Sequence, residues 1–210
     1  MSKINYQKQL DQIIQNLEGE ADKPVLLLHA CCAPCSSYVL EYLHNYFKIL
    51  LFYYNPNINP EVEYQRRVEE IRRFVKEAGY EDEILFLEGP YEPERFFAMA
   101  KGMEDLPERG LRCRACYELR MEEAAREAAR QGADYFTTTL SISPHKDAQW
   151  INEIGEELSG KYGVAHLPSD FKKKSGYLRS IELSKEYGLY RQDYCGCIFS
   201  KKAAQSLRSS

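Results

Sequence analysis

Short apolar runs alternate along the chain with longer amphipathic stretches. The apolar runs are continuous rather than alternating in polarity, which is typical of strands buried on both faces of a parallel sheet. They cover residues 25–28, 49–54, 84–87, 134–140 and 164–167. Because an amphipathic segment separates most of these runs from the next, the pattern predicts an α/β domain, with an open parallel sheet and helices on both faces.

Helix signals between the runs agree with this order. After Asn59-Pro60-Glu61 the chain keeps one apolar stripe until Gly79, which is a stop signal. Residues 117–131 are rich in Ala, Glu and Arg, as in an exposed helix. Ser143-Pro144 predicts the start of a further helix.

We expect a helical extension over residues 1–23 and a single domain over 24–210, with a small helical insertion at 89–110. The net charge of −4 argues against wholesale coating by nucleic acid. Residues 171–210, however, carry nine Lys or Arg against three Asp or Glu, a net of +6. This asymmetry predicts a basic surface on an otherwise acidic body.

The chain has no run that approaches the roughly 18 apolar residues of a membrane span, and its first residues lack the apolar core of a signal peptide. We therefore expect a cytoplasmic protein without a membrane partner. Seven cysteines fall in three groups and none stands alone. Free cysteines often only fill cores, but grouped cysteines in a cytosolic chain indicate metal or redox chemistry more often than structural disulfides.

The first cysteine group follows the first predicted strand, which ends at His29-Ala30. Ligands of open parallel sheets bind beyond the carboxyl ends of the strands, so Cys31, Cys32 and Cys35 occupy the place of an active-site loop. A helix that begins here would point its positive end at the loop, which lowers thiol pKa values and favours anionic clusters.

The second group, Cys113-Arg-Ala-Cys116, lies at or near the start of a helix. Two of its thiolates and two from the first group would complete a [4Fe–4S] cluster or a tetrahedral zinc site, and the spacing does not choose which two. In the third group only Gly196 separates Cys195 from Cys197, so a disulfide there would be strained and easily reduced. This spacing is typical of an electron-carrying dithiol or of two further metal ligands.

Other polar residues offer contacts to a substrate. His29 is a candidate ligand or proton donor, although a hydrogen-bonded histidine at a strand end explains it equally well. His145 follows another strand end and is a candidate for substrate or phosphate binding. Basic and aromatic residues near the third group are suited to RNA phosphates and splayed bases, unless they form a solvated loop. They are Lys172, Lys173, Lys174, Tyr177 and Arg179.

Five segments together resemble the epoxyqueuosine reductases of the QueH type, over about residues 24–200. They are HACCAPC, NPNINP, LRCRACYELR, TTTLSISPHKD and FKKKSGYLRSIELSKEYGLYRQDYCGC. The resemblance implies a two-electron reduction of the epoxide of epoxyqueuosine to queuosine, at the wobble position of tRNA and without cobalamin. The fold that we expect is α/β, Rossmann-like of the HUP type, with residues 24–210 as the catalytic domain and 171–210 as its basic segment.

The resemblance further implies a [4Fe–4S] cluster on Cys31, Cys32, Cys113 and Cys116. It also implies a redox-active disulfide pair at Cys195 and Cys197. Cys35 is then left to bind a second, mononuclear iron ion. The proton donor to the oxygen is expected among His29, Asp193 and Tyr194. The partners would be a tRNA anticodon loop and an electron donor that the sequence does not identify.

The main alternative is a zinc-stabilised RNA-binding module without redox activity. An ATP-dependent tRNA-modifying enzyme on a similar sheet would need a glycine-rich loop after the first strand, where this chain has HACCAPC. A general thiol–disulfide oxidoreductase would use fewer thiols and would leave the basic segment unexplained.

Overall fold

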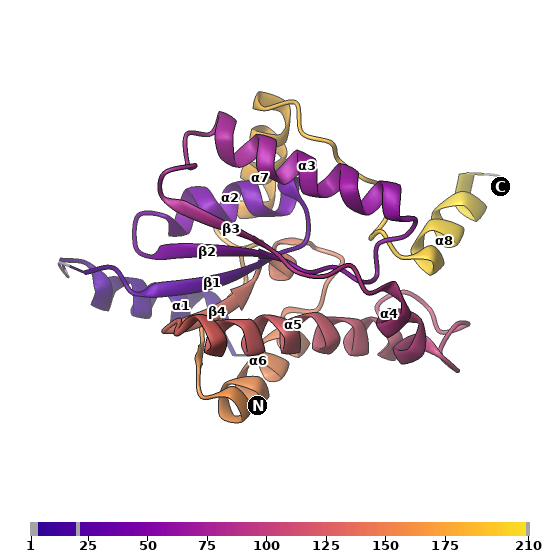
Figure 1. The fold of residues 1–210 in the computed structure, drawn as a ribbon, viewed down its shortest axis with the longest axis horizontal. Coiled ribbons are helices and arrows are strands. Elements are labelled where there is room, and N and C mark those ends of the chain that lie inside the picture. The colour runs from indigo at the N-terminus through magenta and orange to yellow at the C-terminus, as the bar shows by residue number, and fades with distance from the viewer. Residues whose placement is uncertain (1–3, 20–21, 209–210) are drawn as a thin grey trace.

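The computed structural model describes residues 4–19 and 22–208, and its centre is an open, all-parallel sheet (Figure 1). The strands lie in the order β3-β2-β1-β4-β5. Their bounds are β1 (Val25–Ala30), β2 (Lys48–Tyr53), β3 (Ile84–Glu88), β4 (Tyr135–Thr138) and β5 (Ala165–His166). Every predicted strand is confirmed, and the α/β fold with a Rossmann-like sheet is confirmed with them.

Helices cover both faces of this sheet, as Figure 1 shows. The helices are α1 (Tyr6–Leu17), α2 (Ala33–Leu43), α3 (Glu61–Glu77), α4 (Pro93–Ala100), α5 (Leu111–Gln131), the 3-10 helix η1 (Thr139–Ile142), α6 (Ala148–Tyr162), α7 (Gly176–Glu186) and α8 (Ile198–Arg208). Side chains of α1, α2 and α3 form one core with the sheet, and those of α5 and α6 form the other. None of the helices in the described part of the chain is both long and apolar enough to cross a membrane.

Strand β1 shows why continuous apolar runs predicted the strands. Leu26 and Leu28 belong to the core under α2 and α3, whereas Leu27 belongs to the core under α5 and α6. All three side chains have no exposed surface. A strand that is covered on both faces has no polar side, so its sequence cannot alternate.

The predicted N-terminal extension contains α1, while residues 1–3 and 20–21 lie outside the described residues. This helix packs on the main domain, because Leu10 and Ile14 are buried in the same core as α2 and α3. Asp11 accepts a hydrogen bond from the hydroxyl of Tyr42 on α2 at 3.1 Å.

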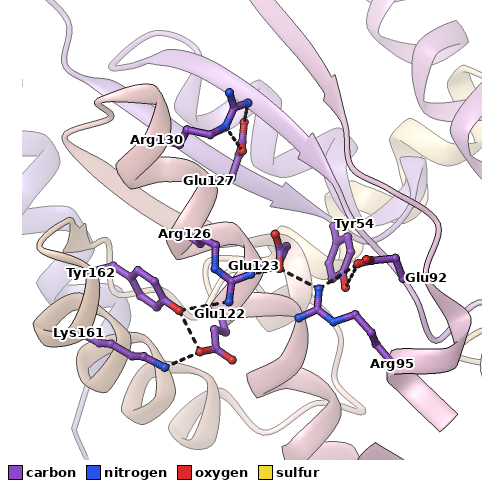
Figure 2. Close-up of polar contacts among 10 residues, drawn as sticks. All are labelled: Tyr54, Glu92, Arg95, Glu122, Glu123, Arg126, Glu127, Arg130, Lys161 and Tyr162. Atoms are coloured by element: carbon purple, nitrogen blue, oxygen red, sulfur yellow. Dashed lines mark hydrogen bonds and ion pairs between the residues drawn. The ribbon is translucent and has the colours of Figure 1, made fainter. Parts of the chain in front are cut away.

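The insertion between β3 and α5 carries α4, and polar contacts tie α4 to α5 and α5 to α6 (Figure 2). Arg95 of α4 donates to Glu123 of α5 at 3.0 Å. On the neighbouring position of α5, Glu122 accepts from the Tyr162 hydroxyl at 2.9 Å and from the ammonium of Lys161. Exposed pairs of this kind contribute about 0.2–1 kcal/mol each, so they align α5 but the apolar core holds it in place.

The helix expected to begin at Ser143-Pro144 begins later, at Ala148. Asp147 is its N-cap, and its carboxylate accepts hydrogen bonds from the backbone N–H groups of Gln149 and Trp150. The prediction was wrong because a proline at the first turn and a capping carboxylate three residues later are both start signals. The segment 143–147 is therefore a loop at the carboxyl edge of the sheet.

Candidate functional site

The first cysteine group lies at the carboxyl end of β1, where sheet topology predicts a ligand site. Cys31 follows the strand, Cys32 is the N-cap residue of α2, and Cys35 lies in the first turn of α2. The three Sγ atoms all lie within 4.8 Å of one another. Cys31 and Cys32 are 8% and 7% exposed. Three sulfur ligands therefore converge on one point at the buried edge of the sheet.

Neighbouring strands hold this loop through hydrogen bonds. The backbone N–H of Cys31 donates to the hydroxyl of Thr139 at 3.1 Å, and that hydroxyl lies 3.3 Å from the Cys31 Sγ atom. The side-chain amide of Asn55, which follows β2, donates to the carbonyl of Ala30 at 2.9 Å. The sulfur arrangement is thus fixed by residues that follow β4 and β2 as well as by its own strand.

His29 forms part of this support. Its Nδ1 atom lies 2.8 Å from the hydroxyl of Thr138, and its Nε2 atom lies 2.9 Å from the carbonyl oxygen of Tyr54. Burial lowers the pKa of His29 to about 3, so the ring is neutral. Because the side chain is fully buried and both nitrogens are occupied, His29 positions the loop and does not line its cavity.

Hydrogen bonds among the thiols and nearby cations set the pKa values of the three cysteines. Hydrogen bonds from Cys32 and Cys35 lower the pKa of the Cys31 thiol, and the charges of Lys146 and Arg120 lower it further. The hydrogen bond between Cys31 and Cys32 raises the pKa of Cys32 to about 12. The hydrogen bonds of Cys35 with the other two cysteines raise its pKa as well. The trio therefore loses one proton readily, and a bound metal would have to displace the others.

The second and third groups meet at a small cavity of about 60 Å³, which is lined by Cys113, Cys116, Cys195 and Cys197. Cys113 and Cys116 lie in the first turns of α5, as predicted. Burial raises the pKa values of Cys113, Cys116 and Cys197, that of Cys116 to about 12. All seven cysteines are described, and all are free thiols.

A larger cavity of about 410 Å³ opens in front of the first group. Cys31, Cys32 and Cys35 form part of its wall, and Cys195 forms another part. Cys195 therefore lines both cavities and is exposed. Tyr177 and Tyr194 also line the larger cavity, which thus presents both sulfur atoms and aromatic residues.

The segment with Cys195 and Cys197 is docked on α3. The carbonyl of Gly196 accepts from the backbone N–H of Asn59 at 3.2 Å, and the carbonyl of Cys195 accepts from the Arg67 guanidinium at 3.4 Å. Gly196 has φ +109°, a conformation that residues with a Cβ rarely adopt. Arg67 is buried and also bonds Glu63 at 2.8 Å.

Of the substrate residues predicted from the sequence, His145 and Tyr177 line the larger cavity. Three of the basic residues instead form ion pairs elsewhere. Lys172 pairs with Asp170, Lys174 with Asp11 at 2.7 Å, and Arg179 with Glu41 at 2.6 Å. Lys173 is exposed, and none of these four lines either cysteine cavity.

Sequence reasoning missed the buried polar residues around the sulfurs, namely Asn55, Arg67, Arg120 and the half-buried Lys146. Arg120 donates to the side-chain oxygen of Asn55. One signal was available, because Arg120 lies four residues after Cys116 and so shares its face of α5.

The residues present fit an iron–sulfur or zinc group in their donor chemistry, since thiolate sulfur suits both. Cys31, Cys32 and Cys35 form the group that the geometry brings together, whereas the sequence had set Cys35 apart. The assignment of Cys31, Cys32, Cys113 and Cys116 to one cluster stays a prediction.

The comparisons with known proteins agree with the cysteine pattern. The family model described as epoxyqueuosine reductase QueH matches residues 26–203. The epoxyqueuosine reductase QueH of Staphylococcus epidermidis is 46% identical over 202 residues, which is 94% of this chain and 85% of that protein. The proteins of the same name from Haemophilus influenzae and Thermotoga maritima are 42% and 36% identical, over 87% and 83% of this chain and 74% and 89% of their own. The chain belongs to the QueH family of epoxyqueuosine reductases, a family of oxidoreductases.

Proposed function

We propose that this protein reduces the epoxide of epoxyqueuosine in tRNA to the alkene of queuosine, in the cytoplasm and without cobalamin. The observation that carries the proposal is the convergence of three sulfurs, those of the buried Cys31 and Cys32 and the half-buried Cys35, within 4.8 Å of one another on a cavity that Cys195 also lines. Membership of the QueH family supports the choice of substrate.

The proposed cofactor is a [4Fe–4S] cluster. Cys31, Cys32, Cys113 and Cys116 would hold it, and Cys35 would bind a second iron ion. When bound, these groups supply single electrons and a Lewis acid. The buried Arg120 and the half-buried Lys146 support this set, because both are cations that face the sulfurs and offset their negative charge.

The pair Cys195 and Cys197 supplies two electrons and two protons when its thiols form a disulfide. The epoxide takes up the same two electrons and two protons, loses its oxygen as water and becomes the alkene, so the two half-reactions balance. An external donor then returns the disulfide to the dithiol. The exposure of Cys195, and its place on both cavities, support this role.

Asp193 and Tyr194 are the proposed proton donors to the leaving oxygen, because both line the larger cavity. His29, which was a third candidate, is enclosed below the cysteine loop and is proposed to orient it.

The first test is anaerobic isolation followed by analysis of iron, sulfide and zinc and by an absorption spectrum. We expect a brown protein whose band near roughly 400 nm bleaches on reduction, as for thiolate-bound clusters. Turnover of tRNA carrying epoxyqueuosine, with dithionite as the electron source, should follow. Cys195→Ser and Cys197→Ser should each abolish turnover and keep the full iron content, whereas Cys31→Ser should lose iron.

A colourless protein with stoichiometric zinc, unchanged after cluster reconstitution, would contradict the proposal. It would favour the zinc-stabilised RNA-binding module. Loss of iron in Cys195→Ser would reject the division between cluster ligands and redox pair while leaving the reaction itself open to the turnover assay.

A further inference from the structure

The basic run predicted to contact RNA is largely neutralised inside the molecule. Lys172, Lys174 and Arg179 each form an ion pair with a carboxylate of this chain. Arg179 also lies 3.3 Å from Glu182 and 3.9 Å from Glu186. A phosphate that approached these cations would have to compete with carboxylates already in place, so the charge count along the sequence overstates their attraction.

A third cavity, of about 190 Å³, lies beside the cysteine cavities. Pro144, His145 and Lys146 form a wall that it shares with the larger cavity. Arg109 and the half-buried Trp150 form the other wall. A ligand that fills the larger cavity and continues past the 143–147 loop therefore enters this one.

The cations of this third cavity are free of carboxylates. Among residues 4–19 and 22–208, neither Arg109 nor Lys146 forms an ion pair, and Arg109 contacts the Nδ1 atom of His145. The carboxylate of Asp147 also lies here, but it caps α6 through the N–H groups of Gln149 and Trp150.

The backbone conformation of Arg109 and the position of the Trp150 ring also point to a binding site. Arg109 has φ +65°, a left-handed conformation that costs about 1 kcal/mol in a residue with a Cβ and that clusters at functional sites. Trp150 stands in the first turn of α6 beside the cavity, with the Arg114 guanidinium 5.9 Å from its ring centroid. An aromatic face beside a cation without a carboxylate partner, here Arg109, is a combination that binds single-stranded nucleic acid.

We propose that this third cavity receives the nucleotide adjacent to the target nucleotide, with its base stacked on Trp150 and its phosphate held by Arg109. The inference rests on the proposed function, because it assigns the path of the RNA strand that carries the substrate. It places that path over the 143–150 segment and away from Lys172, Lys174 and Arg179.

The test measures binding of the cluster-loaded protein to an anticodon stem–loop RNA by fluorescence anisotropy at several salt concentrations. Trp150→Ala should weaken binding about tenfold, as expected for the loss of one stacked base, with an unchanged salt dependence. Trp150→Phe should recover most of that loss. Arg109→Gln should weaken binding and reduce the slope of log K against log salt by about 0.7, the contribution of one phosphate; Arg109→Lys should restore the slope.

Trp150 is the only tryptophan of the chain, so its fluorescence reports directly on this cavity. Stacking should quench it when RNA is added. An RNA that lacks the base on one side of the target should lose the quench and should bind wild type and Trp150→Ala equally. The matched controls are Lys174→Gln and Arg179→Gln, which should bind RNA within about twofold of wild type.

The inference fails if Trp150→Ala and Arg109→Gln bind RNA like wild type, and equally if the two control variants carry the loss instead. Measuring the reduction of epoxyqueuosine in tRNA distinguishes a failure of this inference from a failure of the proposed function. A protein that reduces epoxyqueuosine but binds RNA independently of Trp150 refutes only the path. A protein whose RNA binding depends on Trp150 and Arg109, but which lacks turnover, keeps the path and refutes the reaction.

Discussion

Protonation of one buried histidine should make the stability of this protein sensitive to mild acid. His166 ends β5, and its side chain has no exposed surface. Its ring packs against Phe136 at a centroid distance of 5.4 Å. Within the described residues neither ring nitrogen has a hydrogen-bond partner. Glu156 lies 3.6 Å from the Nδ1 atom, but its side chain is 68% exposed, so water screens its attraction and burial prevails.

Burial lowers the pKa of His166 from 6.5 to about 4. Because the folded-state pKa is the lower one, the unfolded chain binds the proton more tightly. The stability is therefore complete above pH 6.5 and is lost as the pH falls toward 4. A difference of this size corresponds to about 3 kcal/mol over the whole window, of which about 2 kcal/mol is lost by pH 5.

The assay is urea unfolding of wild type and His166→Gln, both reduced and metal-free, at pH 7, 6 and 5. We expect the wild type to lose about 2 kcal/mol more than the variant between pH 7 and pH 5. His29, whose pKa burial lowers to about 3, titrates equally in both proteins and cancels in the difference. An identical pH dependence of the two proteins would refute the reasoning, whatever their stabilities at pH 7.

Three further substitutions test the packing of α6 and the charge beside the cysteines. Gly155→Ala should destabilise the fold by about 2 kcal/mol in urea unfolding, because a Cβ there would lie 2.3 Å from the Nε2 atom of His166. Gly160→Ala, in the same helix with nothing within 4 Å, should instead stabilise it by about 0.5–1 kcal/mol, and equal effects would contradict the packing argument. Arg120→Met should reduce the stabilisation gained on metal loading by roughly 2 kcal/mol, because a charged hydrogen-bonding group beside the thiolates is lost. The measurement is the difference between the melting temperatures of loaded and metal-free protein. If the variant shows the same difference as wild type, this prediction is wrong.

The sheet was predictable because its central strands are buried on both faces. Short apolar runs separated by amphipathic helices favour buried strands over buried helix segments, and the order of elements then placed Cys31 and Cys32 at the carboxyl edge. The same topology placed the 143–147 loop there, although the start of α6 was misplaced. These features depend on local pattern and on the general rules of parallel sheets.

The partners of single charged residues were not predictable. Lys174 pairs with Asp11 on α1, and Arg179 with Glu41 on α2. The members of each pair are more than a hundred residues apart in sequence, and a count of charges along the segment cannot register them. Arg67 was missed for the same reason, because a buried arginine in an amphipathic helix has the sequence signature of an exposed one.

The protein holds the group Cys31, Cys32 and Cys35 more firmly than the pair Cys195 and Cys197. This difference matches the roles proposed for the two. Asn55 joins the end of β1 to Arg120 of α5 beneath the first group, and Thr139 holds Cys31 from the other side. Ligands fixed by the protein itself lose little further freedom when a metal binds. Cys195 is exposed, and its segment is held by a backbone hydrogen bond from Asn59 to Gly196 and by a long contact from the Arg67 guanidinium to the Cys195 carbonyl. An exposed thiol on such a segment can change between dithiol and disulfide.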